Sequence, residues 1–306
     1  MTELLKIIDP HIHLWDLWTR LYPHFETPRR TRFGSNAPIA RSYLLEEFLD
    51  EGQGQVEVLG AVHVEAFPTD PVRETETLQA VAERSPIPIA MVSNADLTSP
   101  EFPRLLERHA VFPCFRGIRQ VVNHHPDREL SPTKRELMAD PTFLDGLKLL
   151  GRRGFSFDLQ LYPHQMAQAA ALAAAAPDTQ IILNHAGMWT DFDLNGWTTW
   201  KAGLRKLAAQ PNVAVKISGL SMRVSTWSVE SIRPLVFETL EAFGTQRAMF
   251  ASNFPVDKLK SDYPALWRAF STVVAACSGS ERDALLRDNA QRIYRLSASG
   301  TRPTRP

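Results

Sequence analysis

The sequence lacks several features that would point to particular classes of protein. Its 306 residues include only two cysteines, Cys114 and Cys277, which cannot build a disulfide framework and fit a reducing compartment. It has no run of about 18 apolar residues that could cross a membrane, and its start lacks the apolar segment of a signal peptide. Its 34 basic and 34 acidic side chains cancel, which gives no sign of attraction to nucleic acid or to a membrane surface. We therefore expect a globular, cytoplasmic protein.

Short apolar runs alternate with helical patterns along the whole chain. Helices are expected over 72–84, 140–152, 164–176, 198–210 and 230–243, and the alanine-rich segment 164–176 is a strong helix former. Strands are expected over 5–12, 57–65, 88–95, 115–122, 155–161, 180–185, 212–218 and 247–252. Alternation of this kind predicts an α/β fold, a single parallel (β/α)8 TIM barrel.

The ends of the chain and its missing motifs refine this prediction. No Gly-x-Gly-x-x-Gly follows the first expected strand, which disfavours an open, doubly wound sheet. Two more expected helices, 263–276 and 280–295, would close the barrel and cover one of its ends. No repeat or linker divides the sequence, so we expect one domain over 1–296 and a frayed tail over 297–306. The Pro- and Arg-rich stretch 20–40 is expected to form a long loop.

Polar side chains gather where the expected strands end, which is where (β/α)8 barrels place their active sites. In "IIDPHIHLWD", the two-residue alternation of a strand puts Asp9, His11 and His13 on one face. Any one polar residue here is also explained as a structural hydrogen-bonding group, as we expect for His63 and His109. Burying many of them costs free energy unless they serve one another or a ligand, so we expect a functional site. The other candidates are Glu65, Arg119, Asp158, Gln160, His185, Lys216, Asn253 and Asp257.

Five segments, in this order, resemble the amidohydrolase-related lactonase group of the amidohydrolase superfamily: DPHIHLWD, FRGIR, FSFDLQLYPHQ, NHAG and SNFPVDK. The resemblance covers most of the chain, from about residue 6 to about residue 295. The group includes lactonases acting on L-fuconolactone and on 2-pyrone-4,6-dicarboxylate. The resemblance implies a (β/α)8 barrel that hydrolyses a lactone or a related carbonyl compound. Zinc-dependent decarboxylases and amide hydrolases belong to the same superfamily.

The resemblance also implies roles for individual residues. His11 and His13 match the pair on the first strand, His185 matches the histidine on the sixth, and Arg119 matches an arginine near a substrate carboxylate. The chain departs from the group at Asn253, because related enzymes carry at this position an aspartate that acts as general base. An amide cannot accept a proton at neutral pH, and it is a poor metal ligand beside a carboxylate.

Two interpretations of the histidines remain open. His11, His13 and His185 can together bind a divalent metal such as Zn²⁺, with Glu65 or Asp158 completing the coordination shell. Alternatively, without a metal, they hydrogen-bond the substrate carbonyl and stabilise the oxyanion that develops on it. Because Asn253 is not a base, either a metal or one of Asp158, Asp257 and Glu65 must activate water, and Asn253 would orient that water.

The function we expect is hydrolysis of a lactone, or of a similarly activated cyclic ester, in a small carboxylate-bearing substrate. Arg119 would bind the carboxylate with its planar fork, and Gln160, Lys216, Glu65 and Asp257 would contribute to the pocket. The catalytic set would be His11, His13, His185, Asn253 and Asp158.

Two alternatives belong to other classes of function. One is a metal-dependent decarboxylase or C–N hydrolase with the same histidines, and the other is a barrel that binds a small acid without turnover. Trp15, Trp18 and Trp189 would wall the pocket or pack elsewhere. The sequence does not indicate an oligomeric state.

Overall fold

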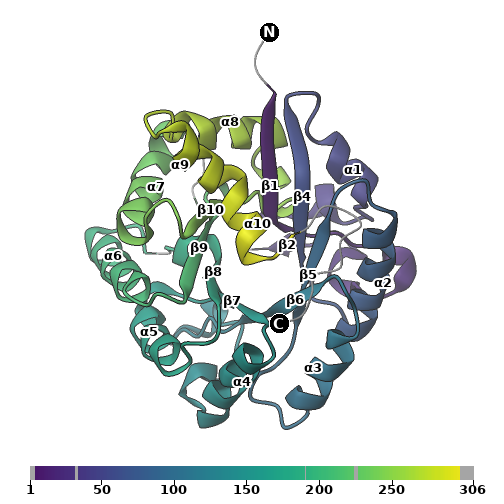
Figure 1. Cartoon of the computed structure of the whole chain (residues 1–306), viewed down its shortest axis with the longest axis vertical. Helices are drawn as coiled ribbons and strands as arrows, with labels where there is room; N and C mark the ends of the chain where they lie inside the picture. Colours follow the sequence, from purple (N-terminus) through teal and green to yellow (C-terminus); the bar gives the residue numbers. More distant parts are fainter. Residues whose placement is uncertain (1–3, 32–33, 190, 224–226, 297–306) are drawn as a thin grey trace.

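Eight parallel strands in chain order form a barrel with helices around it (Figure 1). The computed structural model describes residues 4–31, 34–189, 191–223 and 227–296, so the expected tail lies outside the described residues. The predicted fold is confirmed, and every strand begins and ends within two residues of its expected range. The strands are β1 (Leu5–Ile12), β4 (Val56–Val64), β5 (Ile89–Asn94), β6 (Phe115–Val121), β7 (Ser156–Gln160), β8 (Ile181–Leu183), β9 (Val213–Ile217) and β10 (Ala248–Phe250).

The helices surround the barrel, and several start at a residue whose side chain caps the first turn. Asp70, Asp140, Asp193 and Asp262 accept hydrogen bonds from backbone N–H groups that the helix itself leaves unpaired. No helix in the described ranges is long and apolar enough to cross a membrane. The helices are α1 (Leu45–Asp50), α2 (Pro71–Arg84), α3 (Phe102–Ala110), α4 (Pro141–Arg152), α5 (Met166–Ala175), α6 (Leu194–Ala208), α7 (Val229–Phe243) and α8 (Tyr263–Val273).

Two segments differ from their expected form. The helix expected over 280–295 is divided into α9 (Gly279–Asp283), a π-helical turn (Ala284–Asp288) and α10 (Asn289–Ile293). The loop expected over 20–40 contains short 3-10 turns and a small hairpin of β2 (Arg30–Thr31) and β3 (Gly34–Ser35).

The barrel is closed between its first and last strands by the residues of the first and last motifs. The backbone N–H of Asn253 donates to the carbonyl of His11 over 2.8 Å, and the N–H of His13 donates to the carbonyl of Phe254 over 2.8 Å. The side chains of His13 and Asn253 are therefore held close together by the backbone contact that completes the barrel.

Asp9 supports this closure from outside the site, which corrects the sequence-based placement. Its carboxylate accepts hydrogen bonds from the N–H of Ser252 (3.0 Å) and from the hydroxyl of Tyr263 in α8 (2.9 Å). The register of β1 shifts between Asp9 and Ile12, so the strict alternation that put Asp9 beside His11 does not hold.

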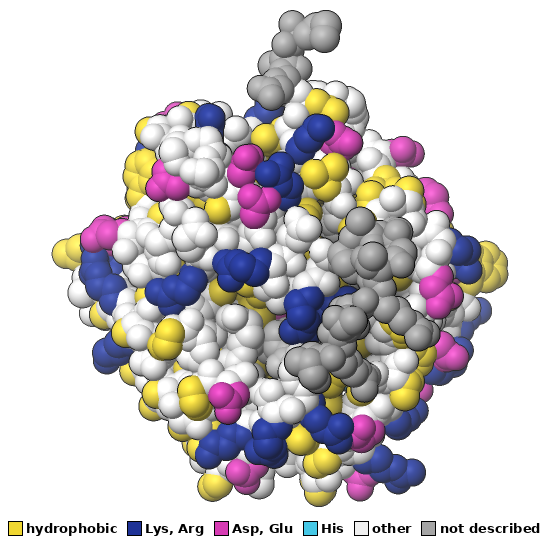
Figure 2. Space-filling model, viewed as in Figure 1, with side chains coloured by type: hydrophobic (Ala, Val, Ile, Leu, Met, Phe, Trp, Pro, Cys, Tyr) yellow, Lys and Arg dark blue, Asp and Glu magenta, His cyan; other side chains and the backbone are white. Residues whose placement is uncertain are grey.

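The amino-terminal end of the barrel is filled, which leaves the carboxyl end for a site. In Figure 1, α10 lies across the barrel opening, and Figure 2 shows basic and acidic side chains interspersed on this face. Ile293 and Tyr294 pack inside the barrel against side chains of the strands, including Ile8, Val62 and Ala214. Burial of these apolar side chains excludes water from the amino-terminal end of the barrel.

Removing the hydroxyl of Tyr263 tests the closure. Tyr263→Phe leaves a buried oxygen of Asp9 without its donor, so we expect the free energy of unfolding to fall by about 1–3 kcal/mol in urea denaturation. Tyr43→Phe is the matched control, since its buried hydroxyl makes a longer bond of 3.3 Å to Glu51. An equal loss of unfolding free energy in both variants would show that the contact between Tyr263 and Asp9 stabilises the fold no more than the contact between Tyr43 and Glu51.

Candidate active site

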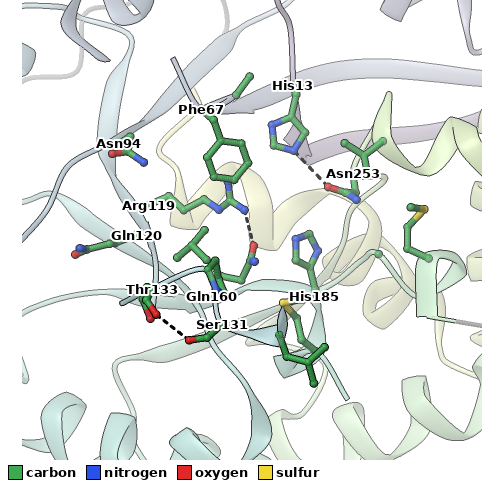
Figure 3. Close-up of a pocket in the computed structure, with 18 of the residues that line it drawn as sticks. His13, Phe67, Asn94, Arg119, Gln120, Ser131, Thr133, Gln160, His185 and Asn253 are labelled. Atoms are coloured by element: carbon green, nitrogen blue, oxygen red, sulfur yellow. Dashed lines mark hydrogen bonds between the residues drawn. The ribbon is translucent and has the colours of Figure 1, made fainter. Parts of the chain in front are cut away.

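A cavity of about 640 Å³ lies at the carboxyl ends of the barrel strands. Five of the ten predicted site residues line it, and Figure 3 shows them facing the same space: His13, Arg119, Gln160, His185 and Asn253. The other five are buried behind this wall, each less than 1 % exposed: His11, Glu65, Asp158, Lys216 and Asp257. The predicted residues are thus brought together, but in two layers.

Three imidazole rings form the centre of the site. The ring of His11 lies between the other two, with centroid distances of 5.0 Å to His13 and 4.7 Å to His185. Neither ring nitrogen of His11 has a hydrogen-bond partner, although both are buried. Burial and the nearby charge of Lys216 lower the pKa of His11 well below its usual value, so the ring is neutral.

The tautomer of His13 follows from its contacts. Its Nδ1 lies 2.8 Å from the carbonyl oxygen of Val64, which can only accept, so Nδ1 carries the proton. Burial, Arg119 and His63 lower the pKa of His13 to about 3, so Nε2 keeps its lone pair. Nε2 lies 3.3 Å from Oδ1 of Asn253 (Figure 3). Nε2 and Oδ1 are both acceptors, so they cannot form a hydrogen bond with each other. The lone pair of Nε2 can therefore accept from a donor such as a water molecule in the cavity.

His185 is placed by the backbone around it. His185 has φ 53° and Ala186 has φ 48°, a left-handed conformation that costs free energy in residues other than glycine. The hydroxyl of Ser218 lies 2.9 Å from Nδ1 of the ring. Gly219 lies against the same ring, and a Cβ at this position would come within 3.0 Å of Nδ1. The segment after β9 therefore packs against the His185 imidazole and fixes its position.

Asn253 connects the cavity to a buried carboxyl group. Its Nδ2 donates to Oδ1 of Asp257 over 3.1 Å, and its backbone has φ 59°, which asparagine tolerates better than most residues. Burial raises the pKa of Asp257 to about 7, with the hydrogen bond from Asn253 acting against the shift. Asp257 therefore fixes the amide, and it lies behind Asn253 instead of on the cavity wall.

Arg119 is held by two side chains on its fork. Nη1 donates to Oε1 of Glu65 over 2.6 Å, Nη2 donates to Gln160, and Phe67 lies with its ring centre 5.5 Å from the guanidinium carbon. Burial raises the pKa of Glu65, and the charge of Arg119 opposes that rise. The guanidinium expected to bind a substrate carboxylate is thus partly occupied by groups of the protein, and its charge is balanced by Glu65.

Lys216 and Asp158 form a second buried ion pair, below the cavity. Lys216 Nζ donates to Oδ1 of Asp158 over 2.6 Å, and burial lowers the pKa of Lys216 while Asp158 counteracts this. Asp158 also accepts from Nδ2 of Asn184 (3.0 Å) and from the hydroxyl of Tyr294 (2.9 Å). The expectation that Asp158 and Lys216 line the pocket is therefore wrong, because both lie under its floor with their polar atoms engaged by each other.

The tryptophans expected near the pocket divide into three cases. Trp15 is buried and lines the cavity, as expected. Trp18 is 88 % exposed and has no part in the wall. Trp189 packs with its ring centre 5.2 Å from that of Trp197 of α6.

The sequence pattern of the family described as Amidohydrolase matches residues 8–296. The chain belongs to the amidohydrolase family. It is 45% identical over 296 residues to the uncharacterized protein y4mH of Sinorhizobium fredii, covering 95% of this chain and 99% of that one. It is 30% identical over 222 residues to L-fucono-1,5-lactonase of Burkholderia multivorans, covering 68% and 71% of the two chains. A solved amidohydrolase of Burkholderia multivorans with bound zinc is 27% identical, with a TM-score of 0.78, over 96% of this chain and 100% of the other.

The arrangement of residues in this amidohydrolase does not fit a metal centre. Within residues 4–296, apart from the three short gaps, no three His, Cys, Asp or Glu side chains are placed to share an ion. The three imidazoles supply suitable donors, but an amide stands where a carboxylate would complete the shell, and Asp257 is bonded behind it. We therefore derive no step of the reaction through a metal.

Two residues that contact the candidate site residues are not predicted from the sequence, Tyr294 and Gly219. Tyr294 comes from the far end of the barrel, and nothing in its local pattern indicates that its hydroxyl reaches Asp158. Gly219 follows a strand that ends in "KISG", and a glycine directly after a barrel strand was an available signal for a close backbone approach.

Restoring the carboxylate tests the effect of Asn253. Asn253→Asp adds a negative charge and a metal-ligating group beside the imidazoles, so we expect the variant to bind Zn²⁺ at least tenfold more tightly than the wild-type protein, roughly the value of one extra ligand. Asn253→Ala is the control and should gain no zinc affinity. Equal zinc affinity in all three proteins, measured by calorimetry, would place residue 253 outside reach of the histidines.

A buried carboxyl group near the wall gives the stability a pH dependence. Glu74 accepts from the N–H of Ala66 over 3.0 Å and lies 3.4 Å from Nε2 of His63, and burial raises its pKa to about 8. A raised carboxyl pKa stabilises the folded state at low pH, and this contribution is lost as pH rises from about 4.5 through about 8.

Glu74→Gln keeps the acceptor and removes this titration. We expect the free energy of unfolding of the variant, relative to the wild type, to increase by roughly 1–3 kcal/mol between pH 6 and pH 8. Urea denaturation at both pH values measures this difference. A constant difference would mean that Glu74 is ionised in the folded protein.

Proposed function

We propose that this amidohydrolase opens lactones by hydrolysis. The observation that carries the proposal is the lone pair of His13 Nε2, whose ring is oriented by Val64 and which lies beside Asn253 in the cavity that His185 also lines. The likeness to L-fucono-1,5-lactonase of Burkholderia multivorans supports the same reaction class. These residues provide a proton acceptor and hydrogen-bonding groups around one small volume, as acyl transfer to water requires.

The reaction forms one bond to the carbonyl carbon and breaks another. Water adds its oxygen to the lactone carbonyl, which gives a tetrahedral oxyanion. Its collapse breaks the bond between the carbonyl carbon and the ring oxygen, and the proton removed from water passes to that ring oxygen. The product is a hydroxy acid, which loses its carboxyl proton at neutral pH.

His13 takes the proton of the attacking water in this scheme, in place of the carboxylates expected from the sequence. Glu65, Asp158 and Asp257 are fully buried and do not line the cavity. With a pKa of about 3 it is neutral at pH 7, so Nε2 accepts without first losing a proton. The oxyanion forming nearby favours the imidazolium and so raises the basicity of His13 when it is needed. Asn253 orients the water, and His185 hydrogen-bonds the carbonyl oxygen. His11 lies behind both rings, and we assign it the role of positioning them.

A substrate panel tests the proposal and separates it from the alternatives. Five- and six-membered lactones, matched cyclic amides and hydroxybenzoic acids are incubated with the purified protein, and products are measured by chromatography. We expect turnover of lactones alone. Release of CO2 from an aromatic acid would indicate a decarboxylase, cleavage of the amides a C–N hydrolase, and binding without any turnover a small-acid binding protein.

Removal of one imidazole tests the mechanism. We expect His13→Ala to lower kcat by about 100-fold or more, the scale of losing a general base or an oxyanion-stabilising group, with circular dichroism unchanged. His164→Ala is the matched control, because His164 is exposed on the loop after β7 and does not line the cavity. Near-normal kcat in His13→Ala would return His13 to a purely structural role.

A further inference from the structure

We propose that Glu65 makes the cavity selective for uncharged lactones, because it neutralises Arg119 on the cavity wall. The proposal rests on the proposed lactone hydrolysis and names the class of lactone. It replaces the expectation of a carboxylate-bearing substrate, which depended on a free fork at Arg119.

The ion pair between Arg119 and Glu65 is buried on both sides. The Arg119 side chain is 5 % exposed and that of Glu65 is 0 % exposed, with 2.6 Å between Nη1 and Oε1. The second carboxylate oxygen of Glu65 accepts from the N–H of Phe67 over 2.7 Å. Both oxygens of Glu65 are therefore engaged, and the carboxylate stays beside the guanidinium.

Other groups of the protein also occupy part of the Arg119 guanidinium. Nη2 donates to the amide oxygen of Gln160, and the ring of Phe67 covers the guanidinium. Nη1 and Nη2 each use one of their two N–H groups on the protein, and the carboxylate of Glu65 balances the guanidinium charge. A carboxylate ligand would therefore meet an arginine whose charge is already compensated, whereas a neutral oxygen can still accept a hydrogen bond from it.

The described part of the cavity wall carries no second lysine or arginine. Among the described residues that line the cavity, Arg119 is the only lysine or arginine, whereas Asp96 and Glu129 are both on the wall. The other buried cation, Lys216, is paired with Asp158 below the floor. Partial burial opposes the ionisation of Asp96, but hydrogen bonds from Thr98 and Gln120 outweigh it and lower its pKa. The cavity wall is thus neutral to negative.

The charge of the cavity wall favours neutral substrates over anionic ones, and it also favours the neutral substrate over the anionic product. A carboxylate entering the cavity loses its hydration and finds no free cation to replace it, whereas a neutral lactone loses little. Polar neutral groups still have partners, since Asn94, Gln120, Ser131 and Thr133 line the outer part of the cavity (Figure 3). Hydrolysis turns the neutral lactone into a hydroxy-acid anion, which the same charge balance helps to expel.

The wild-type protein gives the first test. We measure kcat/KM for L-fucono-1,5-lactone as a neutral probe and for 2-pyrone-4,6-dicarboxylate as an anionic probe. We expect the neutral lactone to be preferred at least tenfold, about the effect of one uncompensated charge. Preference for the dicarboxylate would overturn this inference and leave lactone hydrolysis standing, whereas turnover of neither probe would count against the proposed function.

The second test unmasks Arg119 and works with or without turnover. Calorimetry compares binding of L-fuconate with binding of its neutral primary amide. Glu65→Gln keeps an acceptor for Arg119 but removes the compensating charge, so it should tighten binding of the anion at least tenfold relative to the amide, about the effect of one uncompensated charge. The double variant Glu65→Gln with Arg119→Gln should lose that gain, and thermal melting checks that each variant is folded.

Asp96→Asn is the matched control for the second test. It removes a negative charge from the cavity wall without touching Arg119, so we expect it to change the anion-to-amide ratio by less than about threefold, since exposed charges are screened by solvent and salt. An unchanged ratio in a folded Glu65→Gln variant, or an equal change in Asp96→Asn, would contradict the assignment to Glu65.

Discussion

The site is organised by the burial of two positive charges inside the barrel. Arg119 and Lys216 are both almost completely buried, and removing an ion from water costs several kcal/mol unless an opposite charge and hydrogen bonds replace the hydration. Glu65 pairs with Arg119 and Asp158 pairs with Lys216, each over 2.6 Å. The four charged groups nearest the histidines therefore form ion pairs with one another. The groups left to bind a ligand are the imidazoles and amides on the cavity wall.

The second ion pair connects opposite ends of the barrel. Tyr294, beyond the carboxyl end of α10, donates its hydroxyl to Asp158 from the closed end, and Asn184 donates to the same carboxylate from the residue before His185. Asp158 thus joins the element that fills the barrel to the loop that carries a histidine of the site. His185 has unfavourable backbone dihedral angles. Its placement depends on the hydrogen bond from Asn184 to Asp158 and on the close approach of Gly219 to its ring.

Sequence periodicity predicted the fold and the neighbourhood of the site well. The alternation of short apolar runs with helices determines which residues come at strand ends, and five of the ten predicted residues line the cavity. Periodicity gives the face of a strand but not the depth of a side chain along the barrel axis. This is why Asp158 and Lys216 were expected on the wall and are found under it.

The remaining errors come from long-range contacts and local irregularity. The pairing of Arg119 with Glu65 joins residues 54 positions apart, and only the barrel brings them together. A register shift in β1 turned Asp9 toward Tyr263, which simple alternation does not foresee. The function-bearing motifs around His11, His185 and Asn253 were recognisable, because their order along the chain is that of the strands that carry them.

Proton release by chelator-treated protein tests the central claim most directly. Each neutral lactone opened to a hydroxy acid yields one carboxyl proton at pH 7.5, so a pH-stat follows the reaction without any label. The account predicts proton release at the same rate before and after dialysis against EDTA, since in the proposed mechanism His13 and Asn253 act on water without a metal. Absence of proton release with every lactone, or activity that is lost with EDTA and restored by zinc, would contradict it.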